Sequence, residues 1–139
     1  MNKHPNITDL IPHSGKMVLL DAIDDYGENW LQATVNISNQ STFYKDGGVS
    51  SVYALEYMAQ TIAAFAGIKN AEQRKAKKIG FITGCRKFNV ETEKFVTGQK
   101  LLVRAEEYFN DGKILAFDCW IKDGKLLASA RINVYVQDN

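Results

Sequence analysis

The stretch GGVSSVYALEYMAQTIAAFAG, residues 47–67, is apolar around almost its whole circumference when it is read as a helix. Such a helix has no polar face to give to water, so the rest of the fold has to enclose it on nearly all sides. Glu56 nevertheless lies in its middle. An ionised carboxylate is costly to bury without a partner, so Glu56 needs either a structural partner or a chemical role.

Polar residues are few along this helix, and two of them fall on one side. Glu56 and Gln60 are four residues apart, so their side chains share a narrow face that has to look at a cavity, a partner subunit or ordered water. Ser50 or Ser51 is a suitable N-cap, and Gly67 is predicted to end the helix.

The remainder of the chain has the period-two pattern of β-strands. We expect strands over residues 17–27, 30–38, 77–90, 99–110, 113–122 and 125–136, with a polar loop over 39–48. Asp-Gly pairs at 111–112 and 123–124 predict that the last three strands form hairpins. One buried helix with five or six strands predicts an α+β fold in which the sheet curls around the helix.

Composition excludes several classes of function. The 139 residues suit one domain, 1–139, and a net charge of +1 gives no general electrostatic footprint for nucleic acid or an anionic membrane. The apolar helix is broken by Glu56 and Gln60 and is too short to span a bilayer comfortably. Cys85 and Cys119 lie far apart, without a metal-binding spacing, which favours a reduced cytoplasmic protein with no metal and no cofactor.

Four segments together resemble a known family: LIPHSGKMVLLDAI, LEYMAQTIAAFAG, GFITGCRKFNV and FVTGQKLLVRAE, in this order. They are similar to the β-hydroxyacyl–acyl carrier protein dehydratases, and most of all to a small branch found with aryl polyene and related biosynthetic clusters. The resemblance implies the hot-dog fold, a curved antiparallel sheet around one long helix. It also implies a homodimer or heterodimer with acyl tunnels at the subunit interface.

The family uses a helix carboxylate and a histidine of the partner chain, and only the carboxylate carries over cleanly, to Glu56. Counting back from Glu56 places the loop histidine of the family at Thr42. His13 matches the histidine of the PH motif, which is distinct from the usual catalytic one. The chain has one other histidine, His4, in a terminus that is expected to fray, so we expect Glu56 and His13 to be the catalytic pair. Gln60 falls on the glutamine of the MAQ motif.

Dehydration of a β-hydroxyacyl thioester needs a base for the α-proton, an acid for the leaving hydroxyl and donors for the thioester oxygen. Backbone N–H groups around residues 48–52 could supply those donors. The expected substrate-binding residues are Gly48, Val49, Gln60 and Arg86, and Arg86 is expected to neutralise Glu56 or to hold a phosphopantetheine phosphate.

Each of these roles has a structural alternative. Glu56 could reach water at a dimer seam or pair with a buried arginine such as Arg86. His13 could be a turn histidine that bonds the backbone after Pro12. Gln60 could be a polar tether that holds the helix to the sheet.

Three functions remain open. The first is dehydration of β-hydroxyacyl thioesters in fatty-acid, polyketide or aryl polyene biosynthesis, with an acyl carrier protein or acyl coenzyme A as the partner. The second is a hot-dog thioesterase, because KDGGVSSVYALE is similar to the loop and helix acid of that family, with Asp46 in place of histidine. The third is a catalytically weak subunit of a heteromeric dehydratase, which the missing loop histidine would explain.

Overall fold

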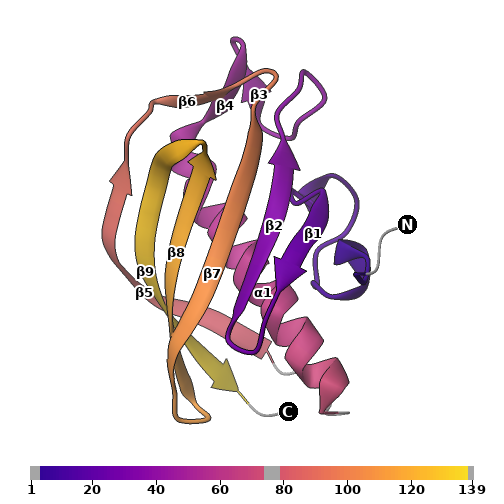
Figure 1. The fold of residues 1–139 in the computed structure, drawn as a ribbon, viewed down its shortest axis with the longest axis vertical. Helices are drawn as coiled ribbons and strands as arrows, with labels where there is room; N and C mark the ends of the chain where they lie inside the picture. The colour runs from indigo at the N-terminus through magenta and orange to yellow at the C-terminus, as the bar shows by residue number, and fades with distance from the viewer. Residues whose placement is uncertain (1–3, 74–78, 138–139) are drawn as a thin grey trace.

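The computed structural model describes residues 4–73 and 79–137, and Figure 1 shows its elements. In chain order they are the 3-10 helices η1 (Ile7–Asp9) and η2 (Gly15–Met17), strands β1 (Ala22–Tyr26), β2 (Trp30–Asn36), β3 (Tyr44–Lys45) and β4 (Gly48–Ser50), the 3-10 helix η3 (Ser51–Tyr53), helix α1 (Ala54–Glu72), and strands β5 (Ile79–Val90), β6 (Lys94–Val96), β7 (Lys100–Asn110), β8 (Ile114–Asp123) and β9 (Lys125–Gln137).

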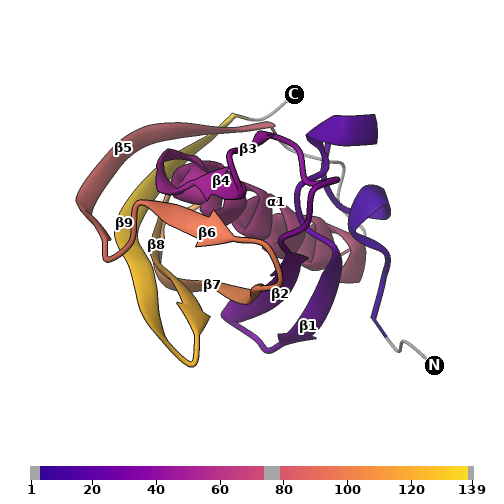
Figure 2. The same ribbon diagram turned by 90° about the horizontal axis from the view of Figure 1, so that it is seen from above.

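Six strands form one antiparallel sheet in the order β1-β2-β7-β8-β9-β5. Seen from above in Figure 2, this sheet curves around α1. A second, small sheet, β3-β4-β6, lies near the N-terminal end of the helix. The predicted α+β fold with a sheet wrapped around one long helix is therefore confirmed.

The core lies between the concave face of the sheet and α1. Alternate residues of each central strand point inward, for example Leu101, Val103 and Ala105 of β7, all of them fully buried. Phe65 of the helix meets Phe117 of β8 edge to face, with ring centroids 5.9 Å apart. Each large apolar side chain that is fully buried here stabilises the fold by about 1.5–3 kcal/mol.

The strand expected over 17–27 is shorter in the structure, and β1 begins only at Ala22. The reason is that Leu19 donates its backbone N–H to a side chain of α1, Gln60, at 2.9 Å. The loop expected over 39–48 contains β3 and the start of β4, and β6 was missed, because strands of two or three residues are too short to show a period. In the strand expected over 77–90, residues 77 and 78 lie outside the described part.

Helix α1 does not end at Gly67 but continues to Glu72, so that prediction is wrong. A Cβ at position 67 would lie 2.5 Å from the carbonyl oxygen of Leu10, so glycine is needed there for close packing of the N-terminal segment. The expected cap is present: Ser50 Oγ accepts a hydrogen bond from Val52 N at 3.4 Å and caps η3, which leads directly into α1.

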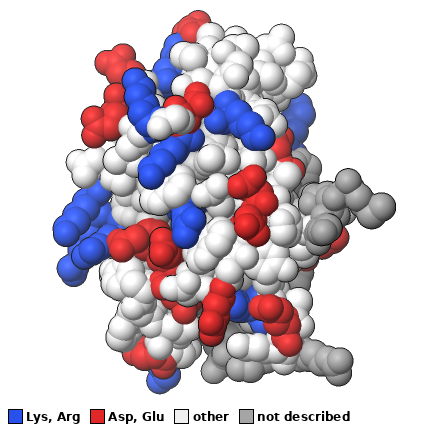
Figure 3. Space-filling model, viewed as in Figure 1, with Lys and Arg blue, Asp and Glu red and all other residues white. Residues whose placement is uncertain are grey.

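On the face of the molecule in Figure 3, acidic and basic side chains are interspersed. Arg131 pairs with Asp118 at 2.8 Å, and Arg104 pairs with Glu106 at 3.4 Å. None of the described helices is long and apolar enough to cross a membrane.

Candidate active site

Glu56 lies on the one side of α1 that the sheet does not cover. The next two helix residues, Tyr57 and Met58, are at most 1% exposed, whereas the Glu56 side chain is 38% exposed. The residues that share its side of the helix are also half-buried: Leu55, Ala59, Ala63 and Ala66. The carboxylate therefore looks out through an otherwise apolar stripe. The shared polar face predicted for Glu56 and Gln60 is met only in part, because Gln60 is fully buried.

His13 and Glu56 of the same chain face each other. The distance from His13 Nε2 to Glu56 Oε1 is 3.5 Å, and the imidazole is 28% exposed. His13 Nδ1 is buried on the other side of the ring and has no hydrogen-bond partner among the described residues. The turn-histidine alternative, in which the ring bonds the backbone, is therefore not what the structure has.

Gln60 holds the segment that follows His13. Its Oε1 accepts from Leu19 N at 2.9 Å, and its Nε2 donates to Met17 O at 2.6 Å and to Glu56 Oε1 at 3.4 Å. The side chain is fully buried. This arrangement favours the tether alternative, although the tethered segment precedes β1 and is not part of the sheet.

The loop before the helix reaches the same segment from the other side. Thr42, at the position counted for the loop histidine of the family, donates its hydroxyl to Lys16 O at 2.6 Å. The next residue, Phe43, has a positive φ of 70° and stacks on Tyr53 with centroids 4.0 Å apart. No local sequence pattern indicates these contacts, because they join residues that are ten or more positions apart in the chain.

Gly48 and Val49 are both buried and form β4, between β3 and β6. A Cβ at Gly48 would collide with the carbonyl oxygen of Phe95 in β6, so this glycine serves the close approach of two strands. Strand packing therefore explains why residue 48 is a glycine. The substrate-binding role expected for Gly48 and Val49 stays a prediction.

Two of the backbone amides expected to receive a thioester oxygen already have acceptors. Ser51 N donates to Glu93 O at 3.0 Å, and Val52 N donates to Ser50 Oγ at 3.4 Å. These two amides are therefore not free to act as an oxyanion hole, which corrects the expectation for this part of the chain.

The structure places Arg86 on an edge strand of the six-stranded sheet. It lies in β5, exposed and opposite Arg131 of β9, and within the described residues it forms no ion pair with Glu56. Within one chain Arg86 therefore does not neutralise Glu56, and its expected role in holding a phosphopantetheine phosphate stays a prediction.

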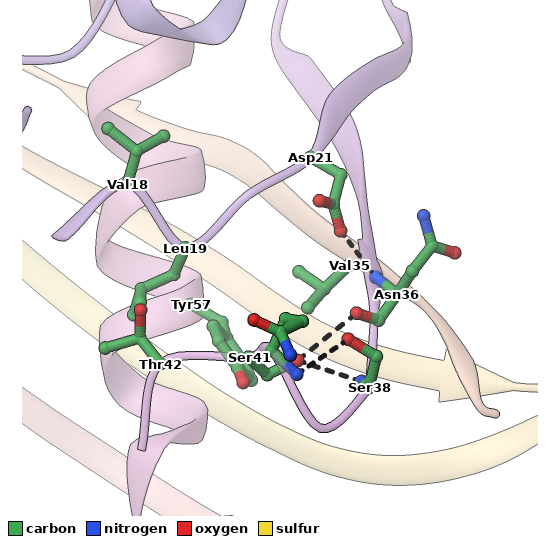
Figure 4. Close-up of a pocket in the computed structure, with 10 residues that line it drawn as sticks. Val18, Leu19, Asp21, Val35, Asn36, Ser38, Ser41, Thr42 and Tyr57 are labelled. Carbon is green, nitrogen blue, oxygen red and sulfur yellow. Dashed lines mark hydrogen bonds between the residues drawn. The ribbon is translucent and has the colours of Figure 1, made fainter. Parts of the chain in front are cut away.

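A pocket of about 180 Å³ opens beside residues 18–21 and helix α1, as Figure 4 shows. Val18 and Leu19, from the segment that Gln60 holds, line it together with Asp21 and Tyr57. Burial, and less strongly the Asp21 carboxylate, raise the pKa of Tyr57 to about 12, so its hydroxyl stays protonated near neutral pH. In residues 4–73 and 79–137 no group of His, Cys, Asp or Glu side chains is arranged to hold a metal ion.

The chain is similar to known proteins both in sequence and in fold. A model of the ApeP-like family, described as ApeP dehydratase, matches residues 5–139. The 3-hydroxyacyl-[acyl-carrier-protein] dehydratase FabZ of Acinetobacter baylyi is 25% identical over 134 residues, which cover 92% of this chain and 90% of FabZ. The chain is also similar to a solved structure titled the dehydratase heterocomplex ApeI:P from Xenorhabdus doucetiae, with a TM-score of 0.90, 24% identity, and coverage of 99% of this chain and 94% of that one. The PaaI protein of E. coli shares the fold more distantly, with a TM-score of 0.64 and 13% identity over 81% of this chain and 80% of that one.

Proposed function

Because this chain belongs to the ApeP-like dehydratase family, we propose that it removes water from β-hydroxyacyl thioesters carried by an acyl carrier protein, with Glu56 and His13 as its proton-transfer pair. It is a dehydratase-like lyase that acts on hydroxyacyl substrates in biosynthesis. The observation that carries the assignment of the pair is the 3.5 Å contact between Glu56 Oε1 and His13 Nε2 at the open side of α1.

Dehydration requires that one member of the Glu56–His13 pair carries a proton and that the other can accept one. The α-proton of the substrate goes to one member, and the proton held by the other member goes to the departing β-hydroxyl, which leaves as water. Transfer of the first proton across the contact between Glu56 and His13 then restores the starting state. This arrangement replaces the family's loop histidine, whose counted position is Thr42, with a histidine from the same chain.

The test is to incubate the protein with a β-hydroxyacyl carrier protein and to follow loss of water from the intact thioester by mass spectrometry. A product lighter by one water supports the dehydratase. Release of the free carrier thiol would favour the thioesterase alternative. Loss of water from a β-hydroxyacyl coenzyme A, with no carrier protein present, would exclude the carrier protein as an essential partner.

We further propose that the active form contains two hot-dog subunits, joined along β5, in the reducing cytoplasm. β5 is the last strand of the sheet order, and its described side chains are exposed or half-exposed on both faces. Four large apolar side chains of this strand are 38–49% exposed: Phe81, Ile82, Phe88 and Val90. An unpaired edge of this kind is a template for another strand. Both cysteines are free, which fits a reducing compartment.

Light scattering at micromolar concentration, with this chain alone and with a related hot-dog chain, tests the assembly. Twice the subunit mass of 15.6 kDa for the chain alone supports a homodimer. A monomer that gains both mass and activity with the second chain supports a heterodimer, and a monomer under both conditions would exclude the proposal.

A further inference from the structure

Gln60 makes three contacts that join the two halves of the proposed catalytic pair. The His13 side is reached through the backbone, at Met17 O and Leu19 N, four and six residues after the histidine. The Glu56 side is reached directly, at Oε1. One side-chain amide thus touches both the carboxylate and the segment that carries the imidazole.

The hydrogen-bonding capacity of this amide is almost fully used. Both hydrogens of its NH2 group have acceptors, Met17 O and Glu56 Oε1, and its oxygen accepts from Leu19. Since the side chain is also 0% exposed, it has no donor left for a substrate. Contact with substrate is therefore a poor explanation of this residue.

The direct contact also selects one oxygen of the carboxylate. Gln60 Nε2 and His13 Nε2 both lie near Oε1 of Glu56, at 3.4 and 3.5 Å. Fixing Oε1 between these two nitrogens fixes the plane of the carboxyl group and leaves Oε2 without either contact. Thr42, which bonds Lys16 O, holds the same segment from the opposite side.

We propose that Gln60 is a positioning residue of the dehydration reaction: it sets the orientation of the Glu56 carboxylate relative to the imidazole of His13. This inference rests on the proposed function of the pair. A misplacement of about 1 Å in such a pair costs up to about 100-fold in rate, so the effect of Gln60 should appear in kcat.

Gln60→Glu is the informative variant. A buried carboxyl group without a cationic partner stays neutral, and a neutral carboxyl has one O–H and one C=O. These can replace the bonds to Met17 O and Leu19 N, while the second hydrogen, the one given to Glu56, is lost. The tether is kept and only the positioning contact is deleted.

We expect Gln60→Glu to lower kcat about 10- to 100-fold, with KM changed less than about threefold and the melting temperature close to that of the wild type. In a Glu56→Gln background the same change should have no further effect on kcat, because the group being positioned is gone. The matched control is Thr61→Val, which removes another buried hydrogen bond of α1, to Tyr57 O at 2.9 Å, and should leave kcat unchanged.

A second readout does not depend on activity. The chain has only two histidines, so the imidazole NMR signals of His13 can be followed with those of His4 as an internal reference. Gln60→Glu should shift the His13 signals and leave the His4 signals in place, and Gln60→Met, which deletes the whole tether, should do the same at a lower melting temperature.

The possible results distinguish the proposed dehydratase function from the positioning role of Gln60. A wild-type protein that removes no water, alone or with a partner chain, while the His13 signals still respond to Gln60→Glu, overturns the proposed function but supports the positioning contact. An active wild type whose kcat and His13 signals are both unaffected by Gln60→Glu overturns the positioning role.

Discussion

The six-stranded sheet has two edges, β1 on the N-terminal side of the molecule and β5 on the other side, and they differ in how the edge is protected. Beside β1, residues 13–19 are bonded from two directions, by Gln60 of α1 and by Thr42 of the loop. The strand β1 itself is only five residues long and carries two exposed aspartates, Asp24 and Asp25. Short length and charge are the usual protection of a sheet edge.

At the other end of the sheet, β5 is twelve residues long and presents apolar side chains such as Phe81 and Phe88 to solvent. It pairs with β9 on one side, with two irregularities in register, and within the described residues its other side has no strand. The difference agrees with the two proposals made above, a proton-transfer pair assembled within the chain and a second subunit joined along β5. The following predictions test this division, beginning with the largest effect.

Glu56→Gln tests whether the N-terminal side holds the chemistry. The variant keeps shape and polarity but removes the group that exchanges a proton, so the dehydration rate should fall by roughly 10²–10⁴. The melting temperature should hold or rise slightly, because a partly desolvated charge has gone. Both quantities are measured on one preparation.

The matched control is Glu72→Gln at the far end of the same helix, where the carboxylate is 55% exposed and pairs with Lys69 at 3.5 Å. Glu72→Gln removes one carboxylate from α1, as Glu56→Gln does, but it should leave the dehydration rate at the wild-type value. If Glu56→Gln melted markedly lower and yet turned over normally, Glu56 would be part of the scaffold.

The fold was predictable from the sequence because it depends on periodic patterns. The apolar helix and the alternation in β2, β7, β8 and β9 determine one arrangement, and the hairpin glycines Gly112 and Gly124 have the positive φ values, 92° and 75°, that such turns require. His13 and Glu56 were also predicted as a pair, Glu56 from the resemblance and His13 in place of the missing loop histidine, and they do lie 3.5 Å apart.

The remaining features depend on contacts between distant residues, which no local pattern encodes. Gln60 was recognised as polar in an apolar helix, but its partners are 41 and 43 residues away. Gly67 reads as a helix end, yet its role is set by the backbone of Leu10. Arg86 was expected to neutralise Glu56 or to hold a phosphate, but the pattern of one strand does not show that β5 is an edge strand of the sheet.

Tyr57 provides a second test of how tightly the N-terminal side is closed. Its pKa is raised to about 12 in the folded chain, against 10.0 when unfolded. Stability is therefore fully present below pH 10 and falls as pH rises to 12, by up to about 3 kcal/mol. Tyr57→Phe should remove this part of the alkaline loss.

Urea unfolding between pH 9 and 12 measures the effect. The matched control is Tyr135→Phe, which removes a hydroxyl from a 40% exposed tyrosine in β9, opposite Phe81 of β5. Equal alkaline slopes for wild type and Tyr57→Phe would show that the Tyr57 hydroxyl is not closed off from water in the folded state.

Phe88→Lys tests the β5 side. If a second subunit covers this strand, a buried lysine there should weaken the assembly at least about 30-fold, or about 2 kcal/mol. The stability of the monomer should change by less than about 0.5 kcal/mol, because Phe88 is exposed in the single chain. Analytical ultracentrifugation over a range of concentrations gives the dissociation constant.

Tyr108→Lys is the control for that experiment, since Tyr108 is 52% exposed on β7, away from the edge. It should leave the dissociation constant unchanged. If Phe88→Lys and Tyr108→Lys behaved alike, the apolar surface of β5 would have no special part in assembly.

The smallest effect comes from one substitution made on both sides, glycine to alanine. At Gly67 the new methyl would lie 2.5 Å from Leu10 O, whereas at Gly84 of β5 the nearest atom, Asn133 Nδ2, is 3.9 Å away. Overpacking against backbone costs about 1–3 kcal/mol, and alanine returns about 1 kcal/mol of helix propensity, so Gly67→Ala should lose about 1 kcal/mol. Gly84→Ala should be neutral or stabilise the single chain by up to about 1 kcal/mol, because it restricts the unfolded state without a clash. Thermal unfolding of the two variants gives both values.

Because Leu10 lies three residues before His13, Gly67→Ala should also lower the dehydration rate, and Gly84→Ala should not. Equal stability and equal rates for both variants would mean that the N-terminal segment is not held against α1, and the contrast between the two sides would fail.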